Sequence, residues 1–162
     1  MPYSGDIRVD SLLMPFLDWN FLAPAKTVLN YTFDTSEISV TATSSSLSLG
    51  PLAAFNAAQR DAVRSILNDV TSVTGIPFAE VAGAAQADFH FATTDIGTPS
   101  AAGYMQPGIV GDGPVRGSDY RIDALIYLDS TEYAEANRSP VRGTFGYQTL
   151  LHEIGHALGL GH

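Results

Sequence analysis

The last eleven residues, HEIGHALGLGH (152–162), constrain the fold of this 162-residue chain more than any other segment, and they hold three of its four histidines. His152 and His156 are four residues apart, so on an α-helix they leave the same face one turn apart. A continuing helix would carry position 162 away along its axis, whereas Gly159 can adopt the left-handed conformation without steric cost. The segment therefore predicts a helix that stops at Gly159 and a turn that returns His162 to the other two histidines.

This histidine spacing predicts a zinc site. Two imidazoles one turn apart can reach a single ion at the Zn–N distance of about 2.0–2.1 Å, and His162 would supply the third protein ligand. Three histidines with one open position are typical of catalytic zinc sites, while structural sites are closed by a fourth ligand. Glu153 lies about 100° round the helix from His152, close enough to take a proton from a metal-bound water without ligating the metal. HExxH alone is a weak pattern, but here the glycine and the third histidine also stand at the required positions.

Capping residues delimit a long helix in the middle of the chain. Asn56 is a candidate N-cap with Gln59 three residues later, the spacing of a capping box. An apolar stripe follows, and Gly75 then Pro77 provide the stop signals. Thr144 is the candidate cap of the final helix. β-branched and aromatic runs predict strands at 27–33, 76–81, 88–93 and 124–130, and the glycine- and proline-rich stretch 107–121 predicts a surface loop.

Length, charge and composition exclude some classes of binding partner. The length fits one domain or a large piece of one. A formal charge of −9 repels phosphate backbones, which argues against nucleic acid and anionic membrane as partners. No apolar run approaches the length of a transmembrane helix. Cysteine is absent, which fits either a reducing compartment or a secreted protein stabilised without disulfides. The N-terminal segment lacks the basic and continuous apolar regions of a classical signal peptide.

The HExxHxxGxxH pattern is the metzincin signature, and the surrounding GYQTLLHEIGHALGLGH resembles the active-site helix of the serralysin family, zinc endopeptidases that many bacteria secrete. The resemblance extends over nearly the whole chain, from Asp10 to His162. The matching stretches, in chain order, are DSLL, WNF, VLNYTF, FNAAQRDAVRSILNDVTSVTGIPFAEV, ADFHFAT, AAGYMQPG and ALIYLDS.

The resemblance implies a fold of the α+β class, an α/β-type sandwich. It implies a mixed twisted sheet of about five strands with two long helices, the second carrying the zinc motif. Residues 1–162 would form the upper part of a protease catalytic domain, with an N-terminal arm or short helix in 1–25 and the sheet and helices in 26–162. It further implies a secreted, extracellular and monomeric protein.

The resemblance also implies where a peptide substrate binds. The strand 124–130 would be the sheet edge that lines the cleft, where a peptide adds as an antiparallel strand. Its substrate-binding residues would be Ala124, Leu125, Ile126 and Tyr127. The rim above the zinc would be formed by Ala101, Ala102, Gly103 and Tyr104.

The chain departs from the family after its third histidine. Family members continue to a methionine-containing turn, a tyrosine beside the zinc and a C-terminal subdomain with calcium-binding repeats. None of these follows His162 here. We therefore expect a fragment of a longer protease, weakly active or inactive alone, with calcium bound in the missing repeats.

The leading hypothesis is a zinc-dependent endopeptidase that hydrolyses peptide bonds with a glutamate-assisted, zinc-bound water. A non-catalytic zinc- or peptide-binding remnant of such a protease is the alternative, and a metalloenzyme of other specificity comes third. Glu153 favours the enzyme, because a purely metal-binding site needs no base. His90 has no spaced partner and is expected to be a satisfied or surface residue. Asp112, Asp119 and Asp123 sit in or beside a glycine-rich loop and are candidates for calcium binding, but they lack the spacing of an EF-hand, which favours an ordinary solvated loop.

Overall fold

The computed structural model describes residues 10–14, 19, 26–36, 47–110 and 121–162, so most of the predicted arm lies outside the described residues. A six-stranded sheet forms the centre, with strand order β3-β1-β4-β6-β5 and with β2 paired to β4. The pairs β1–β3, β1–β4 and β4–β6 are parallel, while β2–β4 and β5–β6 are antiparallel. The strands are β1 Leu29–Thr32, β2 Ala53–Ala54, β3 Phe78–Glu80, β4 Phe89–Thr94, β5 Gly103–Val110 and β6 Arg121–Asp129.

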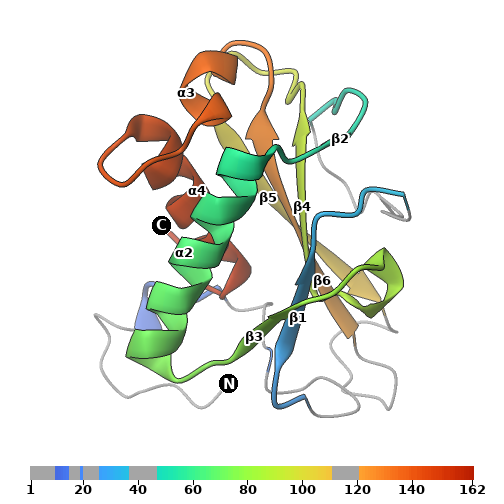
Figure 1. Ribbon diagram of the computed structural model, residues 1–162, viewed down its shortest axis with the longest axis vertical. Helices are drawn as coiled ribbons and strands as arrows, with labels where there is room; N and C mark the ends of the chain where they lie inside the picture. The colour runs from blue at the N-terminus through green and yellow to red at the C-terminus, as the bar shows by residue number, and fades with distance from the viewer. Residues whose placement is uncertain (1–9, 15–18, 20–25, 37–46, 111–120) are drawn as a thin grey trace.

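Helices cover one face of this sheet (Figure 1). They are α2 Ala57–Thr74, α3 Ala134–Arg138 and α4 Phe145–Ala157, and a 3-10 turn lies at Ala84–Gln86. The predicted α+β class with a mixed sheet is confirmed, with one strand more than expected and the short helix α3 in addition. Among the described residues, no helix has both the length and the apolar character needed to cross a membrane.

The caps of α2 are those that the sequence predicts. The Asn56 side chain accepts a hydrogen bond from the Gln59 amide at 3.0 Å, and the Gln59 side chain accepts one from the Asn56 amide at 2.8 Å. Gly75 ends the helix at φ 76°, in the left-handed region, and donates to the Thr71 carbonyl. Residues at or beside its ends therefore supply the caps of this helix.

The main core lies between the helices and the sheet. Val63 and Ile66 of α2 and Leu150 and Ile154 of α4 are fully buried against it. Their apolar partners on the strands are Phe89, Phe91, Ala124, Ile126 and Leu128. A smaller apolar cluster of Ala92, Leu125 and Tyr127 covers the opposite face. Burial of α4 against this core fixes which of its faces remains for the site.

The edge of the sheet differs from the sequence-based expectation. β6 is paired on both sides, by β4 and β5, so the strand expected at the edge is internal. Its residues Ala124, Leu125, Ile126 and Tyr127 are buried, so they offer no free backbone to a peptide, and their assignment as substrate-binding residues is wrong.

Of the two strands that end the described sheet, β3 and β5, the one beside α4 is β5, which begins in the segment expected to be a rim and runs into the segment expected to be a loop. Pro107 and Gly108 made this stretch look like a loop. Proline is tolerated on an edge strand because its missing N–H can face away from the partner strand. Residues 111–120 of the expected loop lie outside the described residues.

Candidate metal centre

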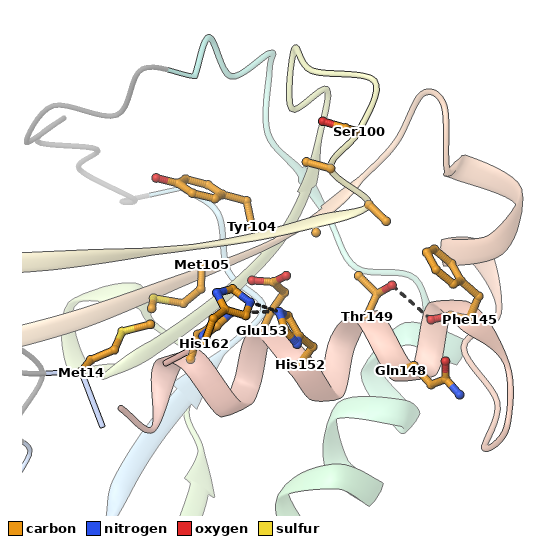
Figure 2. Close-up of a pocket in the computed structure, with 14 residues that line it drawn as sticks. Met14, Ser100, Tyr104, Met105, Phe145, Gln148, Thr149, His152, Glu153 and His162 are labelled. Atoms are coloured by element: carbon orange, nitrogen blue, oxygen red, sulfur yellow. Dashed lines mark hydrogen bonds between the residues drawn. The ribbon is translucent and has the colours of Figure 1, made fainter. Parts of the chain in front are cut away.

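The helix α4 carries two ligand candidates and the candidate base. It begins at Thr144, whose hydroxyl accepts a hydrogen bond from the Tyr147 amide. Leu150, Ile154 and Ala157 anchor one side of it in the core. His152 and Glu153 therefore turn toward β5, as Figure 2 shows.

The three histidines of the motif converge on one point. The Nε2 atom of His152 lies 2.9 Å from Nε2 of His156 and 3.1 Å from Nε2 of His162. Four ligands arranged tetrahedrally at the Zn–N bond length have their nitrogens about 3.3 Å apart. The spacing of these nitrogens thus fits a single tetrahedral ion, and the three residues form a group that could hold a metal.

The turn after α4 brings the third histidine back to the first two. Gly159 has φ 96°, in the left-handed region, and its amide donates to the His156 carbonyl at 2.9 Å. The Leu160 amide donates to the Gly155 carbonyl at 3.0 Å, which closes the turn on the helix. His162 follows directly, so a position ten residues from His152 reaches the same point.

The same turn sets the tautomer of His156. Nδ1 of His156 lies 2.7 Å from the Leu160 carbonyl oxygen. A carbonyl only accepts hydrogen bonds, so Nδ1 carries the proton and Nε2 keeps its lone pair toward the other histidines. Burial and the nearby His156 and His162 lower the pKa of His152, which favours the neutral imidazole that a metal ligand requires.

Glu153 lies beside the histidines, under the edge strand. It is 7% exposed, and burial raises the pKa of its carboxyl to about 7, opposed by a hydrogen bond from the Met105 backbone. A carboxyl group with a pKa near neutrality can both take and return a proton at neutral pH. Glu153 is not part of the converging ligand group.

Close approach of β5 to α4 explains the glycine at position 103. A Cβ placed on Gly103 would lie 2.7 Å from Cγ2 of Thr149, 2.8 Å from Cγ of Glu153 and 3.1 Å from Oε1 of Glu153. Contacts this short do not occur between carbon atoms in folded proteins. Gly103 is therefore the position at which the edge strand leaves room for the Glu153 side chain.

A cleft of about 610 Å³ opens between β5 and α4 and contains the three histidines and Glu153. All four expected rim residues, Ala101, Ala102, Gly103 and Tyr104, line it, whereas residues 124–127 do not. The sequence-based reasoning missed the other residues that line it, Met14, Ser100, Met105, Phe145, Gln148 and Thr149.

Helical spacing could have revealed two of those missed residues. Gln148 and Thr149 stand four residues before His152 and Glu153, so they lie one turn earlier on the same face. Met14 comes from the other end of the chain, and no local pattern marks it. His90 lies in β4, apart from the three histidines; burial lowers the pKa of its imidazole, and its Nδ1 atom has no hydrogen-bond partner.

One further expectation, and one group that the structure brings together, concern acidic residues. Asp112 and Asp119 lie outside the described residues, and Asp123 lies in β6. A second group close enough to share an ion, within the described ranges, is Asp95, Asp129 and Glu132. Both oxygens of Asp129 already accept hydrogen bonds, from Ile96, Thr131 and Tyr133, so this carboxylate is occupied in holding the loop after β6.

Three histidines and a buried glutamate in a cleft are the residue set of a metal-dependent hydrolase. Known proteins of that kind match this chain, although no protein-family model does. The metallopeptidase AprA of Pseudomonas marginalis is 31% identical over 143 residues, which are 88% of this chain and 28% of that protein. The metalloprotease AprA of Pseudomonas entomophila (strain L48) is 29% identical over 161 residues, 99% of this chain and 31% of that protein.

These matches confirm the resemblance to a serralysin-like metalloprotease that the sequence motifs indicated. The similarity extends over most of the chain and includes far more than the histidine motif. The chain spans less than a third of the length of the relatives that it matches.

Proposed function

We propose that this chain is part of the catalytic domain of a zinc-dependent endopeptidase. The observation that carries the proposal is the convergence of three imidazole Nε2 atoms beside a buried glutamate, in a cleft bordered by an edge strand. Zinc is the metal that best suits three neutral imidazoles with one open position. The names of the relatives, metallopeptidase and metalloprotease, support the reaction class.

Each residue of the site has a role in peptide hydrolysis. When bound, zinc would polarise the substrate carbonyl and acidify the attacking water. His152, His156 and His162 hold the metal, and the Leu160 carbonyl keeps His156 in the tautomer that presents Nε2. Glu153 takes the proton of the water and returns it to the leaving amine, which a carboxyl with a pKa of about 7 can do near neutral pH.

The edge of β5 that pairs with no other described strand is the binding surface that we propose for the peptide. One side of β5 is paired with β6, and its other side borders the cleft. An extended peptide would add there as an antiparallel strand, with its scissile bond placed between the histidines and Gly103. The substrate-binding strand is thus β5 rather than β6. By its resemblance to secreted proteases, we propose that the enzyme acts outside the cell, as a monomer.

A non-catalytic metal- or peptide-binding module is the rival function. The position of Glu153 favours the enzyme, because a buried carboxyl costs stability and a site that only holds metal has no need for it. The roles proposed for Glu153 and for the histidines are therefore separable by substitution.

The test compares Glu153→Gln with the wild type in the gene product that contains residues 1–162. We expect zinc to remain at one per chain while peptide hydrolysis falls by about 10²–10⁴-fold, the usual contribution of a positioned acid–base group. Glu135→Gln, on the exposed surface of α3, is the matched control and should change neither quantity. Hydrolysis at the wild-type rate by the zinc-loaded Glu153→Gln variant would show that Glu153 is not the base.

A further inference from the structure

Residues near the N-terminus pair with the turn that carries the third histidine. The Met14 amide donates to the Gly159 carbonyl at 2.7 Å, and the Gly161 amide donates to the Leu12 carbonyl at 2.5 Å. Between these two bonds, Leu13 and Leu160 form an antiparallel bridge. Two segments at opposite ends of the sequence thus form a short two-stranded ladder next to His162.

Trp19 makes a second attachment at the same end of α4. Its indole Nε1 donates to the carbonyl of Ala157, the last residue of the helix, at 2.8 Å. The last carbonyls of a helix have no partner within the helix, so this bond satisfies one of them. The Trp19 ring also packs on Phe89 of β4, with 5.1 Å between ring centroids, which ties the attachment to the core.

The paired turn contributes to the metal site twice. It places His162, and its Leu160 carbonyl holds the proton-bearing Nδ1 of His156. On its inner side the turn is bonded to α4 through the Gly159 and Leu160 amides; on its outer side it is bonded to Leu12 and Met14. Met14 also lines the cleft together with His162 (Figure 2). Loss of the outer bonds would loosen the backbone that positions two of the three ligands.

We propose that residues 12–14 and Trp19 are positioning residues of the metal site. These residues, a part of the arm expected in 1–25, are called the arm from here on, and its docking sets the affinity for the metal. The inference rests on the proposed function in one respect, that the three histidines bind a metal. Coupling between two sites is reciprocal, so metal binding must strengthen arm docking by the same factor by which docking strengthens metal binding. A purely structural arm would stabilise the fold without this coupling.

Two variants of the gene product that contains residues 1–162 remove single bonds of the arm. Met14→Pro removes the N–H that donates to Gly159, and Met14→Leu keeps that N–H together with an apolar side chain, so the two form a matched pair. Trp19→Phe removes the Nε1–H that donates to Ala157 and keeps an aromatic ring over Phe89. Zinc affinity is measured by titration against a competing chelator, and circular dichroism of each metal-free variant reports its folding.

We expect Met14→Pro to bind zinc about tenfold more weakly, at the lower end of the effect of outer-shell partners. Trp19→Phe should weaken binding in the same direction by a smaller factor, and Met14→Leu should match the wild type. Hydrogen exchange supplies a readout independent of activity. Zinc should slow exchange of the Met14 and Gly161 amides in the wild type, and should slow that of Gly161 less in Met14→Pro.

The outcomes separate this inference from the proposed function. A folded Met14→Pro variant with wild-type zinc affinity would overturn the role of the arm, as would zinc binding that leaves exchange of the Gly161 amide unchanged. If Met14→Pro does not fold, Trp19→Phe decides: weaker zinc binding supports the coupling, and unchanged binding overturns it. A wild-type chain that binds no zinc would overturn the metal site itself, and this inference with it.

Discussion

The two long helices, α2 and α4, pack on the same face of the sheet but depend on different parts of the chain. Residues within or directly beside α2 fix both of its ends, through the capping box of Asn56 and Gln59 and through Gly75. One face of α2 is buried, and the other carries exposed residues such as Val73. α2 is therefore a scaffold that stabilises the sheet and takes no part in the candidate centre.

α4 is capped in the same local way, by Thr144, but its other end is bonded to distant residues in addition to its local turn bonds. Its last carbonyl accepts from Trp19, and the turn that follows is bonded to Leu12 and Met14. One face supplies Leu150 and Ile154 to the core, and the neighbouring face supplies Glu153 and the histidines to the cleft. The comparison shows that the caps of α2 are made by neighbouring residues, whereas the end of α4 beside the candidate metal centre is also held by bonds to distant residues. Substitutions should therefore separate stability from metal chemistry.

The largest effect is expected from His156→Ala. The change removes a proposed ligand and the group bonded to the Leu160 carbonyl, so zinc affinity should fall by more than about a hundredfold, beyond the effect of an outer-shell partner. The caps of α2 are made by Asn56, Gln59 and Gly75 and do not involve His156. The metal-free variant should therefore retain the helical circular dichroism of the wild type. Elemental analysis and zinc titration measure the first effect. Stoichiometric zinc in purified His156→Ala would contradict the ligand assignment.

Gly103→Ala should impair catalysis without removing the metal. The added Cβ would collide with Cγ of Glu153, which must move, and a displacement of about 1 Å at a reacting group can cost about 10²-fold in rate. Gly103 is not one of the three histidines that could hold a metal, so zinc affinity should remain that of the wild type. The measurement is kcat for peptide hydrolysis by the gene product that contains residues 1–162.

Gly83→Ala is the matched control for that substitution, because a Cβ at Gly83 meets nothing within 4 Å and its φ of −105° suits any residue. Equal kcat values for the wild type and both alanine variants would show that the glycine at 103 does not position Glu153.

The same contrast between the helices explains what the sequence could predict. The ends of α2 and the spacing of His152 and His156 on α4 follow from helical periodicity and capping, and such patterns are visible in a single sequence. Strand β5 was missed because Gly103, Pro107 and Gly108 disfavour a strand locally, and pairing with β6 overrides that preference. The contacts of Met14 with the turn after α4 join residues far apart in the sequence, so no local pattern reveals them.

A smaller effect on stability alone is expected from Asn56→Ala. Loss of the N-cap side chain should lower the free energy of unfolding by about 1 kcal/mol. The Asn56 side chain also donates to the Arg138 carbonyl at 3.0 Å, so its loss loosens the link between α2 and α3 as well. Zinc affinity should not change. Urea denaturation measures the loss, with Asn68→Ala as the control, since Asn68 is exposed within the helix and alanine has the higher helix propensity. A cost in Asn68→Ala equal to that in Asn56→Ala would show that capping is not its cause.

The smallest effect is expected at the ion pair that ties α2 to β3. Arg64 donates to both carboxylate oxygens of Glu80, at 2.8 and 3.0 Å, and Tyr31 donates to one of them at 3.3 Å. The hydrogen bonds from Arg64 lower the pKa of Glu80, with burial opposing them. Both side chains are partly exposed to solvent, so Glu80→Gln should cost less than about 1 kcal/mol at pH 7.

The pH dependence of that cost distinguishes charge from packing. Because the pKa of Glu80 is lower in the folded state, its ionised carboxylate stabilises the fold fully above the ordinary glutamate pKa of about 4.3, and this stabilisation is lost as the pH falls through the folded-state pKa. Glutamine cannot titrate, so the difference in unfolding free energy between wild type and Glu80→Gln should shrink toward zero over that range. Asp61→Asn, which removes the other carboxylate bonded to Arg64, should cost less, because Asp61 is the more exposed partner. A difference between wild type and Glu80→Gln that stays constant from pH 7 into the acid range would show that packing, rather than charge, ties α2 to the sheet.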